Sequence, residues 1–213
     1  MSILQIAVDA LSMERALLLS DQIWDVVDLF EVGTPMILRD GMEPVRRLKA
    51  RHPELKLLAD TKIVDGGSME CADACEAGAD VVTVLALACD STIRAVAETA
   101  HRFGRRAMAD LLNVADLSRR APELLALGVD YVCVHTAVDV QGQGRTPLGE
   151  LRELVRAIPP ERAAVAGGIN QDTIDAYLAE QPAIVIMGNA LCGAEDVRAA
   201  ALQAQARVRS GRQ

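Results

Sequence analysis

The chain has 213 residues, of which 51% are hydrophobic but only 2% aromatic, so its core must be built from small aliphatic side chains. That composition favours one domain with a regular layered fold. The formal net charge of -8 repels nucleic-acid phosphates and anionic lipid, so neither nucleic acid nor a membrane is an expected partner. The opening residues carry no basic region and too short an apolar run for a signal peptide, which predicts a cytoplasmic protein.

Hydrophobic periodicity alternates between strand-like and helix-like segments along the whole chain. Strands are predicted at residues 4–8, 26–32, 56–59, 81–85, 106–110, 131–135, 163–166 and 184–187. Helices are predicted between and after them, at residues 12–23, 42–51, 68–77, 92–103, 117–127, 148–158, 171–180 and 195–208. This alternation predicts an α/β fold, a single (β/α)₈ TIM barrel spanning residues 1–213, with an open doubly wound sheet as the alternative.

Two short phrases are near copies of each other: Glu-Ala-Gly-Ala-Asp at residues 76–80 and Ala-Leu-Gly-Val-Asp at residues 126–130. Each reads as a helix that stops on glycine, followed by the start of a strand. They indicate repeated αβ units.

Titratable side chains recur at or just beyond the carboxyl ends of the predicted strands. These residues are Asp9, Glu31, Asp60, Lys62, Asp65, Asp110 and His135. In a barrel, the carboxyl ends of all strands face one mouth, where active sites are found. The sequence therefore predicts one polar pocket, built from many strands, that is an active site.

Asp60 and Lys62 are two residues apart on one strand, so they share a face and can pair. An ammonium held between Asp60 and Asp65 would stay protonated, because nearby opposite charge favours the ionised form. Lys62 is therefore predicted to be an electrostatic stabiliser or proton donor, and a poor amine nucleophile. The alternative is a purely structural ion pair.

Glu31 is predicted to lie beside Asp60 on the neighbouring strand, where the two carboxylates would repel each other. A hard divalent cation relieves such repulsion, and Mg²⁺ is typically held by one or two carboxylates together with water and substrate oxygens. Alternatively, the two carboxylates share a proton, or each pairs with Lys62.

His135 ends its predicted strand, and Asp110 ends the strand before it. Asp110 could orient the imidazole ring, so His135 is predicted to act as a general acid or base. The alternative is a hydrogen-bonded core histidine.

Glycines follow the last two predicted strands, at Gly167-Gly168 and at Gly188-Asn189. Loops after strands seven and eight of a barrel often bind phosphate through backbone N–H groups. These residues are therefore predicted to bind a phosphate, although both segments could simply be tight turns.

With these residues placed, the chain resembles the orotidine-monophosphate decarboxylase suprafamily. The matching segments are residues 4–9, 31–35, 58–65, 76–80, 134–136 with Asp139 and Gln141, and 166–169. The Asp-x-Lys-x-x-Asp signature at Asp60, Lys62 and Asp65 is the most specific of these. The resemblance implies a homodimer of barrels with active sites at the interface and with Asp65 reaching into the partner's site. It also implies Mg²⁺, or Mn²⁺, held by Glu31 and Asp60.

The suprafamily contains more than one reaction. Its 3-keto-L-gulonate-6-phosphate decarboxylase members carry Glu where this chain has Asp110, and Arg where it has Val138 and Asn189. These departures favour the branch that condenses D-ribulose 5-phosphate with formaldehyde. The decarboxylase, an epimerase of the same barrel, and a sugar-phosphate sensor without catalysis are the alternatives.

For the condensation, the resemblance implies that His135 removes the C1 proton to give an enediolate. Mg²⁺ and Lys62 would stabilise this enediolate, while Asp110 orients His135. Asp9 and Asp65 would fix substrate hydroxyls and Lys62. Gly167, Gly168, Gly188 and Asn189 would hold the phosphate.

Overall fold

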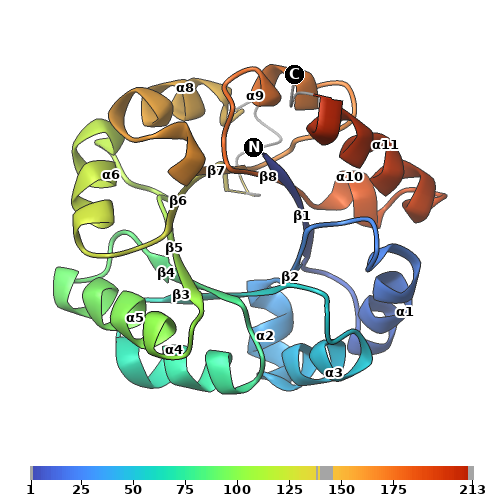
Figure 1. Cartoon of the computed structure of the whole chain (residues 1–213), viewed down its shortest axis with the longest axis horizontal. Helices are drawn as coiled ribbons and strands as arrows, with labels where there is room; N and C mark the ends of the chain where they lie inside the picture. The colour runs from blue at the N-terminus through green and yellow to red at the C-terminus, as the bar shows by residue number, and fades with distance from the viewer. Residues whose placement is uncertain (1, 138, 140–145, 211–213) are drawn as a thin grey trace.

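The computed structural model describes residues 2–137, 139 and 146–210. Eight parallel strands close into a barrel in chain order, and helices surround it (Figure 1). The strands are β1 (Ile3–Val8), β2 (Leu29–Val32), β3 (Leu57–Ile63), β4 (Val81–Leu85), β5 (Arg106–Asp110), β6 (Tyr131–His135), β7 (Ala163–Ala166) and β8 (Ile184–Met187). Because β1 also pairs with β8, the ring confirms the (β/α)₈ barrel and excludes the open sheet.

The helices form the outer layer of the barrel. They are α1 (Met13–Ile23), α2 (Thr34–Asp40), α3 (Glu43–Arg51), α4 (Gly67–Glu76), α5 (Asp90–Arg102), α6 (Leu117–Ala126), α8 (Leu148–Ala157), the 3-10 turn η1 (Pro160–Arg162), α9 (Ile174–Leu178), α10 (Asn189–Cys192) and α11 (Val197–Ser210). Within the described ranges, no helix is long and apolar enough to cross a membrane.

The structure differs from the prediction in several elements. The strand β2 begins at Leu29 rather than at residue 26, and the short helix α10 is not among the predicted helices. The helix α2 is not among the predicted helices, and it begins with Pro35 in its first turn. The strand β3 continues past residue 59 to Ile63. The predicted helix at 171–180 is reduced to α9, because the Asn170 side chain accepts hydrogen bonds from the backbone N–H groups of Asp172 and Thr173 and forms a turn there.

The core has two parts that follow the alternation of side chains along each strand. A large cluster of aliphatic residues fills the space between the strands and the helices. A smaller cluster includes Leu29, Leu58, Met108 and Cys133, which lie two residues before the predicted site residues of their strands. Since side chains two apart share a face, this smaller cluster lies inside the barrel and forms the floor beneath the predicted site.

Three aspartates fasten the amino-terminal end of the barrel. Asp28, Asp80 and Asp130 each precede an even-numbered strand, and each carboxylate accepts a hydrogen bond from a backbone N–H of the preceding strand. The donors are Leu4, Leu57 and Ala107, at 2.9, 3.0 and 2.9 Å. Two of these aspartates end the near-identical phrases in the sequence, so the phrases repeat because they form the same strand-joining contact.

Replacing Asp80 with alanine should destabilise the fold without changing the chemistry. Asp80 also pairs with Lys49 at 2.7 Å, Arg105 at 2.6 Å and Lys56 at 3.3 Å, so its loss removes the shared carboxylate partner of three cations and the acceptor of the Leu57 N–H. We expect the free energy of unfolding to fall by roughly 2–4 kcal/mol, measured by urea denaturation. The kcat of the folded fraction should be unchanged, because Asp80 lies at the end opposite the catalytic mouth; a large loss of kcat would contradict this separation.

Candidate active site

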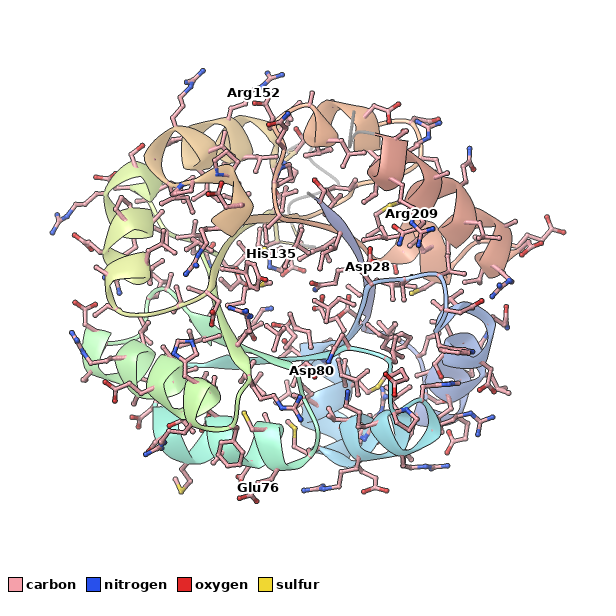
Figure 2. All side chains as sticks on the ribbon, viewed as in Figure 1. Asp28, Glu76, Asp80, His135, Arg152 and Arg209 are labelled. Atoms are coloured by element: carbon pink, nitrogen blue, oxygen red, sulfur yellow. The ribbon has the colours of Figure 1, made fainter. Side chains whose placement is uncertain are left out.

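Titratable side chains form a polar layer inside the barrel. It lies two residues further along the strands, toward their carboxyl ends, than the apolar floor. In four strands a floor residue is followed two positions later by a titratable one: Leu29 by Glu31, Leu58 by Asp60, Met108 by Asp110, and Cys133 by His135. Figure 2 shows His135 within the ring of strands, whereas Glu76 and Arg152 lie on the outer helices. Period-two alternation thus brings residues from distant parts of the chain to one level.

Four of the predicted site residues form a continuous chain of contacts. Lys62 Nζ lies 2.5 Å from Asp60 Oδ2 and 3.2 Å from Asp110 Oδ2. Asp110 Oδ2 in turn lies 3.0 Å from Nδ1 of His135. The predicted pairing of Asp60 with Lys62 and the predicted contact between Asp110 and His135 are both confirmed.

The structure corrects the predicted position of Asp65. The second carboxylate beside the Lys62 ammonium is Asp110, and Asp65 is exposed without an ion pair to Lys62. Proximity in sequence suggested Asp65, but β3 ends at Ile63 and the two residues after it are exposed, whereas Asp110 at the end of β5 lies 3.2 Å from Lys62 Nζ. Asp65 is therefore available at the surface beside Val64, whose exposed fraction is 58%.

The contacts among these four residues favour the charged forms of Lys62 and Asp110. Burial alone would lower the pKa of the Lys62 ammonium, but the charges of Asp60 and Asp110 outweigh burial and raise that pKa above its ordinary value. Burial alone would likewise raise the pKa of Asp110, but the hydrogen bond and charge of His135, with Lys62, hold it below the usual value. The site therefore holds a permanent cation beside an ionised carboxylate.

The pKa values of Glu31 and Asp9 are shifted in the direction that disfavours their charged forms. Burial, followed by the negative charges of Asp60 and Asp9, raises the pKa of Glu31 well above its ordinary value. The pKa of Asp9 is also raised, first by burial and then by Asp60. Glu31 has one neutral donor, Gln5 Nε2, at 2.5 Å from Oε2. On this side of the mouth, the described residues therefore disfavour the ionised forms of Glu31 and Asp9.

The clustered carboxyl groups allow a test of whether a divalent cation fits this side of the mouth. Glu31 and Asp60 offer hard oxygen donors whose mutual repulsion a cation would relieve. The buried Oε1 of Gln5 has no hydrogen-bond partner among the described residues, and a water ligand of such a cation would satisfy it. In residues 2–137, 139 and 146–210, no group of three His, Cys, Asp or Glu side chains could hold a metal alone. The arrangement fits Mg²⁺ bound by two carboxylates and completed by water or substrate.

Two polar residues outside the predicted set also hold the site. The hydroxyl of Thr34, in the first turn of α2, lies 2.8 Å from Asp60 Oδ2 and 2.7 Å from the Asp60 carbonyl oxygen, and its one proton can be donated to either acceptor. Thr83 donates to the other carboxylate oxygen of Asp60 at 2.8 Å. The signal that could have revealed Thr83 is a lone polar residue inside the apolar run Val-Val-Thr-Val-Leu.

The predicted phosphate residues follow the neighbouring strands β7 and β8. Gly167 and Gly168 have φ of 120° and 69°, and an added Cβ at Gly167 would lie 2.8 Å from Thr136 Cβ, so a side chain is excluded there. Gly188 and Asn189 begin α10, which has only four residues. Neither loop leads into a long helix, so a phosphate here would depend on backbone N–H groups rather than on a helix dipole. Val138 and Gln141 lie outside the described residues.

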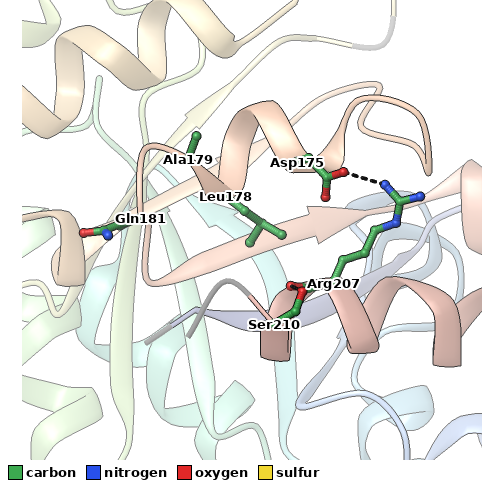
Figure 3. A pocket seen from close by; sticks show the side chains of 6 residues that line it. All are labelled: Asp175, Leu178, Ala179, Gln181, Arg207 and Ser210. Atoms are coloured by element: carbon green, nitrogen blue, oxygen red, sulfur yellow. Dashed lines mark hydrogen bonds and ion pairs between the residues drawn. The ribbon is translucent and has the colours of Figure 1, made fainter. Parts of the chain in front are cut away.

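Two cavities among the described residues differ in their position relative to the predicted site. One, of about 450 Å³, lies beside His135 and is lined by residues of the β5 and β6 loops, among them Leu112, Asn113 and Thr136. The other lies between α9 and α11 and is lined by Asp175, Leu178, Ala179, Gln181, Arg207 and Ser210 (Figure 3). The second contains none of the predicted site residues, so the first is the one that extends the candidate site.

Known proteins match the chain over nearly its full length. The "3-hexulose-6-phosphate synthase 1" of Staphylococcus saprophyticus is 39% identical over 205 residues, covering 96% of this chain and 98% of that protein. The crystal structure of 3-hexulose-6-phosphate synthase from Salmonella typhimurium has a TM-score of 0.95 at 35% identity and covers 98% of this chain and 99% of that one. The 3-keto-L-gulonate-6-phosphate decarboxylase of Vibrio cholerae gives 0.84 at 28% identity, covering 99% and 96%.

The family comparison agrees with these relatives. The sequence profile of the orotidine 5'-phosphate decarboxylase / HUMPS family matches residues 2–204, which include every residue of the candidate site. The motifs in β1, β2, β3, β6 and β7 that suggested the resemblance all lie within that match. The chain belongs to the orotidine 5'-phosphate decarboxylase / HUMPS family.

Proposed function

We propose that this chain is a lyase, a 3-hexulose-6-phosphate synthase, that adds formaldehyde reversibly to D-ribulose 5-phosphate to give D-arabino-3-hexulose 6-phosphate. The observation that carries the proposal is the contact chain from Asp60 through Lys62 and Asp110 to His135 at the barrel mouth. The likeness to 3-hexulose-6-phosphate synthases over 98% of this chain supports this branch of the family.

His135 has the geometry of a general base for the C1 proton of the sugar. The ionised Asp110 accepts a hydrogen bond from Nδ1 at 3.0 Å, so Nδ1 carries the ring proton and the lone pair stays on Nε2. Asp110 is itself held by the backbone N–H of Leu112, which donates to Oδ1 at 2.9 Å. Nε2 would take the C1 proton, and the resulting enediolate would form the new carbon–carbon bond with formaldehyde.

Removal of that proton places negative charge on the sugar oxygens, and the site contains groups that can stabilise this charge. Lys62 remains an ammonium, because Asp60 and Asp110 raise its pKa, so it can stabilise the oxyanion or return a proton to the formaldehyde oxygen. Mg²⁺ held by Glu31 and Asp60 would supply Lewis-acid stabilisation of the same charge when bound. The phosphate would lie against Gly167, Gly168, Gly188 and Asn189, and binding it at a distance would position C1.

The decarboxylase of the same family is the second candidate. Asp110, the residue at which the sequence resemblance separates the two branches, contacts His135 and Lys62 directly. A direct comparison of the two reactions separates the candidates. We expect purified protein with Mg²⁺ to consume ribulose 5-phosphate and formaldehyde together, and to release CO₂ from 3-keto-L-gulonate 6-phosphate far more slowly. Faster release of CO₂ would favour the decarboxylase, and activity with neither would oppose both.

Replacing Gly33 with alanine should reduce kcat/KM by about 100-fold, the scale of a 1 Å misplacement of a reacting group. An added Cβ at Gly33 would lie 2.0 Å from Asp9 Oδ1 and 2.9 Å from the Val8 carbonyl oxygen, so the Asp9 carboxylate and the end of β1 that carries it must shift. Gly149→Ala is the matched control, since nothing lies within 4 Å of a Cβ there. Steady-state kinetics of both variants test the role of Asp9, and equal activities would contradict it.

Asp65 is proposed to act in the partner's active site of a homodimer. Its exposed position, without an ion pair to Lys62, is consistent with this role, and exposed apolar side chains lie near it in sequence: Val64 and Met69 are 58% and 68% exposed. Asp65→Ala and His135→Ala chains, each nearly inactive alone, should regain about a quarter of wild-type activity after subunit exchange. Random pairing gives one intact site in half of the dimers. Failure to recover despite demonstrated exchange would assign Asp65 to its own chain's site.

A further inference from the structure

We propose that Thr83 is a positioning residue, which holds both the Asp60 carboxylate and the backbone of Lys62 in the geometry that catalysis needs. This inference rests on the proposed function. Thr83 is only 3% exposed and is the one polar residue of β4, between Val82 and Val84. A buried hydroxyl in an apolar strand requires hydrogen-bond partners, and its partners here are all in the Asp60–Lys62 segment.

The backbone opposite Thr83 is irregular. Strand β3 pairs with β4 at Ala59 and Val82, and pairing resumes at Ile63 and Val84, so four steps along β3 match two along β4. This bulge contains Lys62, whose φ of 46° lies in the left-handed region that a lysine seldom adopts. Such conformations persist only where the surroundings fix them, and bulges near active sites re-aim side chains.

Thr83 provides what fixes the bulge. Its hydroxyl accepts a hydrogen bond from the Lys62 backbone N–H at 2.9 Å, and its carbonyl accepts one from the Thr61 hydroxyl at 2.8 Å. The ordinary strand ladder is interrupted at this point, so these two bonds replace it. Without the Thr83 hydroxyl, the Lys62 N–H would lose its acceptor and the strained φ would lose its support.

The same hydroxyl also holds the Asp60 carboxylate in its orientation. A backbone N–H can only donate, so the hydroxyl accepts from Lys62 and its single proton remains for Asp60 Oδ1, at 2.8 Å. Thr34 and the Lys62 ammonium occupy Oδ2. One hydroxyl therefore couples the main chain of Lys62 to the carboxylate that Lys62 pairs with, and both the ammonium and the proposed metal ligand depend on it.

The test uses two substitutions at Thr83 and one matched control. Thr83→Val keeps the branched shape but removes the hydroxyl, whereas Thr83→Ser keeps the hydroxyl. Thr99→Val is the control, because Thr99 is 1% exposed and its hydroxyl accepts a hydrogen bond from Arg102, also in α5 and away from the site. We expect Thr83→Val to lower kcat by about 10- to 100-fold with a smaller change in KM for ribulose 5-phosphate. Thr83→Ser should stay within about threefold of wild type.

Two readouts do not depend on turnover. Amide hydrogen exchange at Lys62 should be protected in the wild type and accelerated in Thr83→Val, and Mn²⁺ should bind more weakly to Thr83→Val by electron paramagnetic resonance. Thr99→Val should change neither, although it too loses stability. An unchanged kcat and unchanged Lys62 exchange in folded Thr83→Val would overturn the inference. If the wild type itself showed no synthase activity, the proposed function would fail, while exchange and Mn²⁺ binding would still decide the role of Thr83.

Discussion

Replacing Lys62 with alanine should lower kcat by about two to three orders of magnitude, the scale of losing one group that stabilises an oxyanion. The substitution removes the only cation in contact with Asp60 and Asp110 among the described residues. Those two carboxylates would then face the developing negative charge of the enediolate. Because the Lys62 ammonium stays protonated between them, it cannot act as a free amine, and borohydride added with substrate should trap no adduct.

Lys56→Ala is the control for this result. Lys56 is a neighbour in sequence, but its side chain is 64% exposed and pairs with Asp80 at the other end of the barrel. Its loss should leave kcat near that of the wild type. Steady-state kinetics and mass spectrometry measure both effects. A reduced covalent adduct on Lys62 would contradict the electrostatic role and indicate imine chemistry.

Removing the metal should abolish turnover. The Glu31→Gln variant should show separately what Glu31 contributes to activity and how much its burial lowers the stability of the metal-free protein. We expect EDTA to eliminate activity and Mg²⁺ or Mn²⁺ to restore it. Glu31→Gln should lower activity by at least about 100-fold, yet stabilise the metal-free protein. The reason is that Glu31 is buried beside Asp60 and Asp9, whose charges oppose its ionisation.

The pH dependence of this stabilisation has a definite sign. The pKa of Glu31 in the folded protein is raised above its ordinary value of 4.5, so the unfolded chain releases the proton first. Wild-type stability should therefore fall, relative to Glu31→Gln, as pH rises above about 4.5, by up to about 1.4 kcal/mol per pH unit until the folded-state pKa is reached. Below that range the two should converge.

Thermal unfolding of metal-free protein between pH 4 and pH 8 measures this effect, with the exposed Glu98→Gln as the control. Glu98 makes no contact with the site, so its substitution should show no such pH-dependent gain. Equal stability of Glu31→Gln and wild type at every pH, or full activity in rigorously metal-free protein, would argue against a metal at Glu31 and Asp60.

Periodicity predicted the barrel because nearly every local signal agreed with the fold. Apolar runs bounded by glycine gave five strands with their observed limits, from β4 at Val81–Leu85 to β8 at Ile184–Met187. The prediction failed where a tertiary contact determines the element. Asp60, Thr61 and Lys62 break the apolar run of β3, but hydrogen bonds to Thr83 continue the strand through a bulge.

For the site, residues at strand ends were predictable, but some of their contacts were not. The barrel rule was sufficient to expect Asp110 beside His135, since adjacent parallel strands end at one level. It did not reveal that Asp110 rather than Asp65 would contact Lys62, because this depends on the bulge that re-aims Lys62 toward β5. The supporting residues Thr34 and Gln5 are polar groups whose partners lie 26 residues away, so no local pattern marks them.

The most direct test follows the carbon of formaldehyde. Wild-type protein with Mg²⁺, ribulose 5-phosphate and ¹³C-labelled formaldehyde should give a new labelled hydroxymethyl carbon, at C1 of a hexulose 6-phosphate, by nuclear magnetic resonance. His135→Ala under the same conditions should give none, because no base removes the C1 proton. Label remaining in formaldehyde with the wild type, while the same protein releases CO₂ from 3-keto-L-gulonate 6-phosphate, would contradict the assignment of this site as a formaldehyde-condensing lyase.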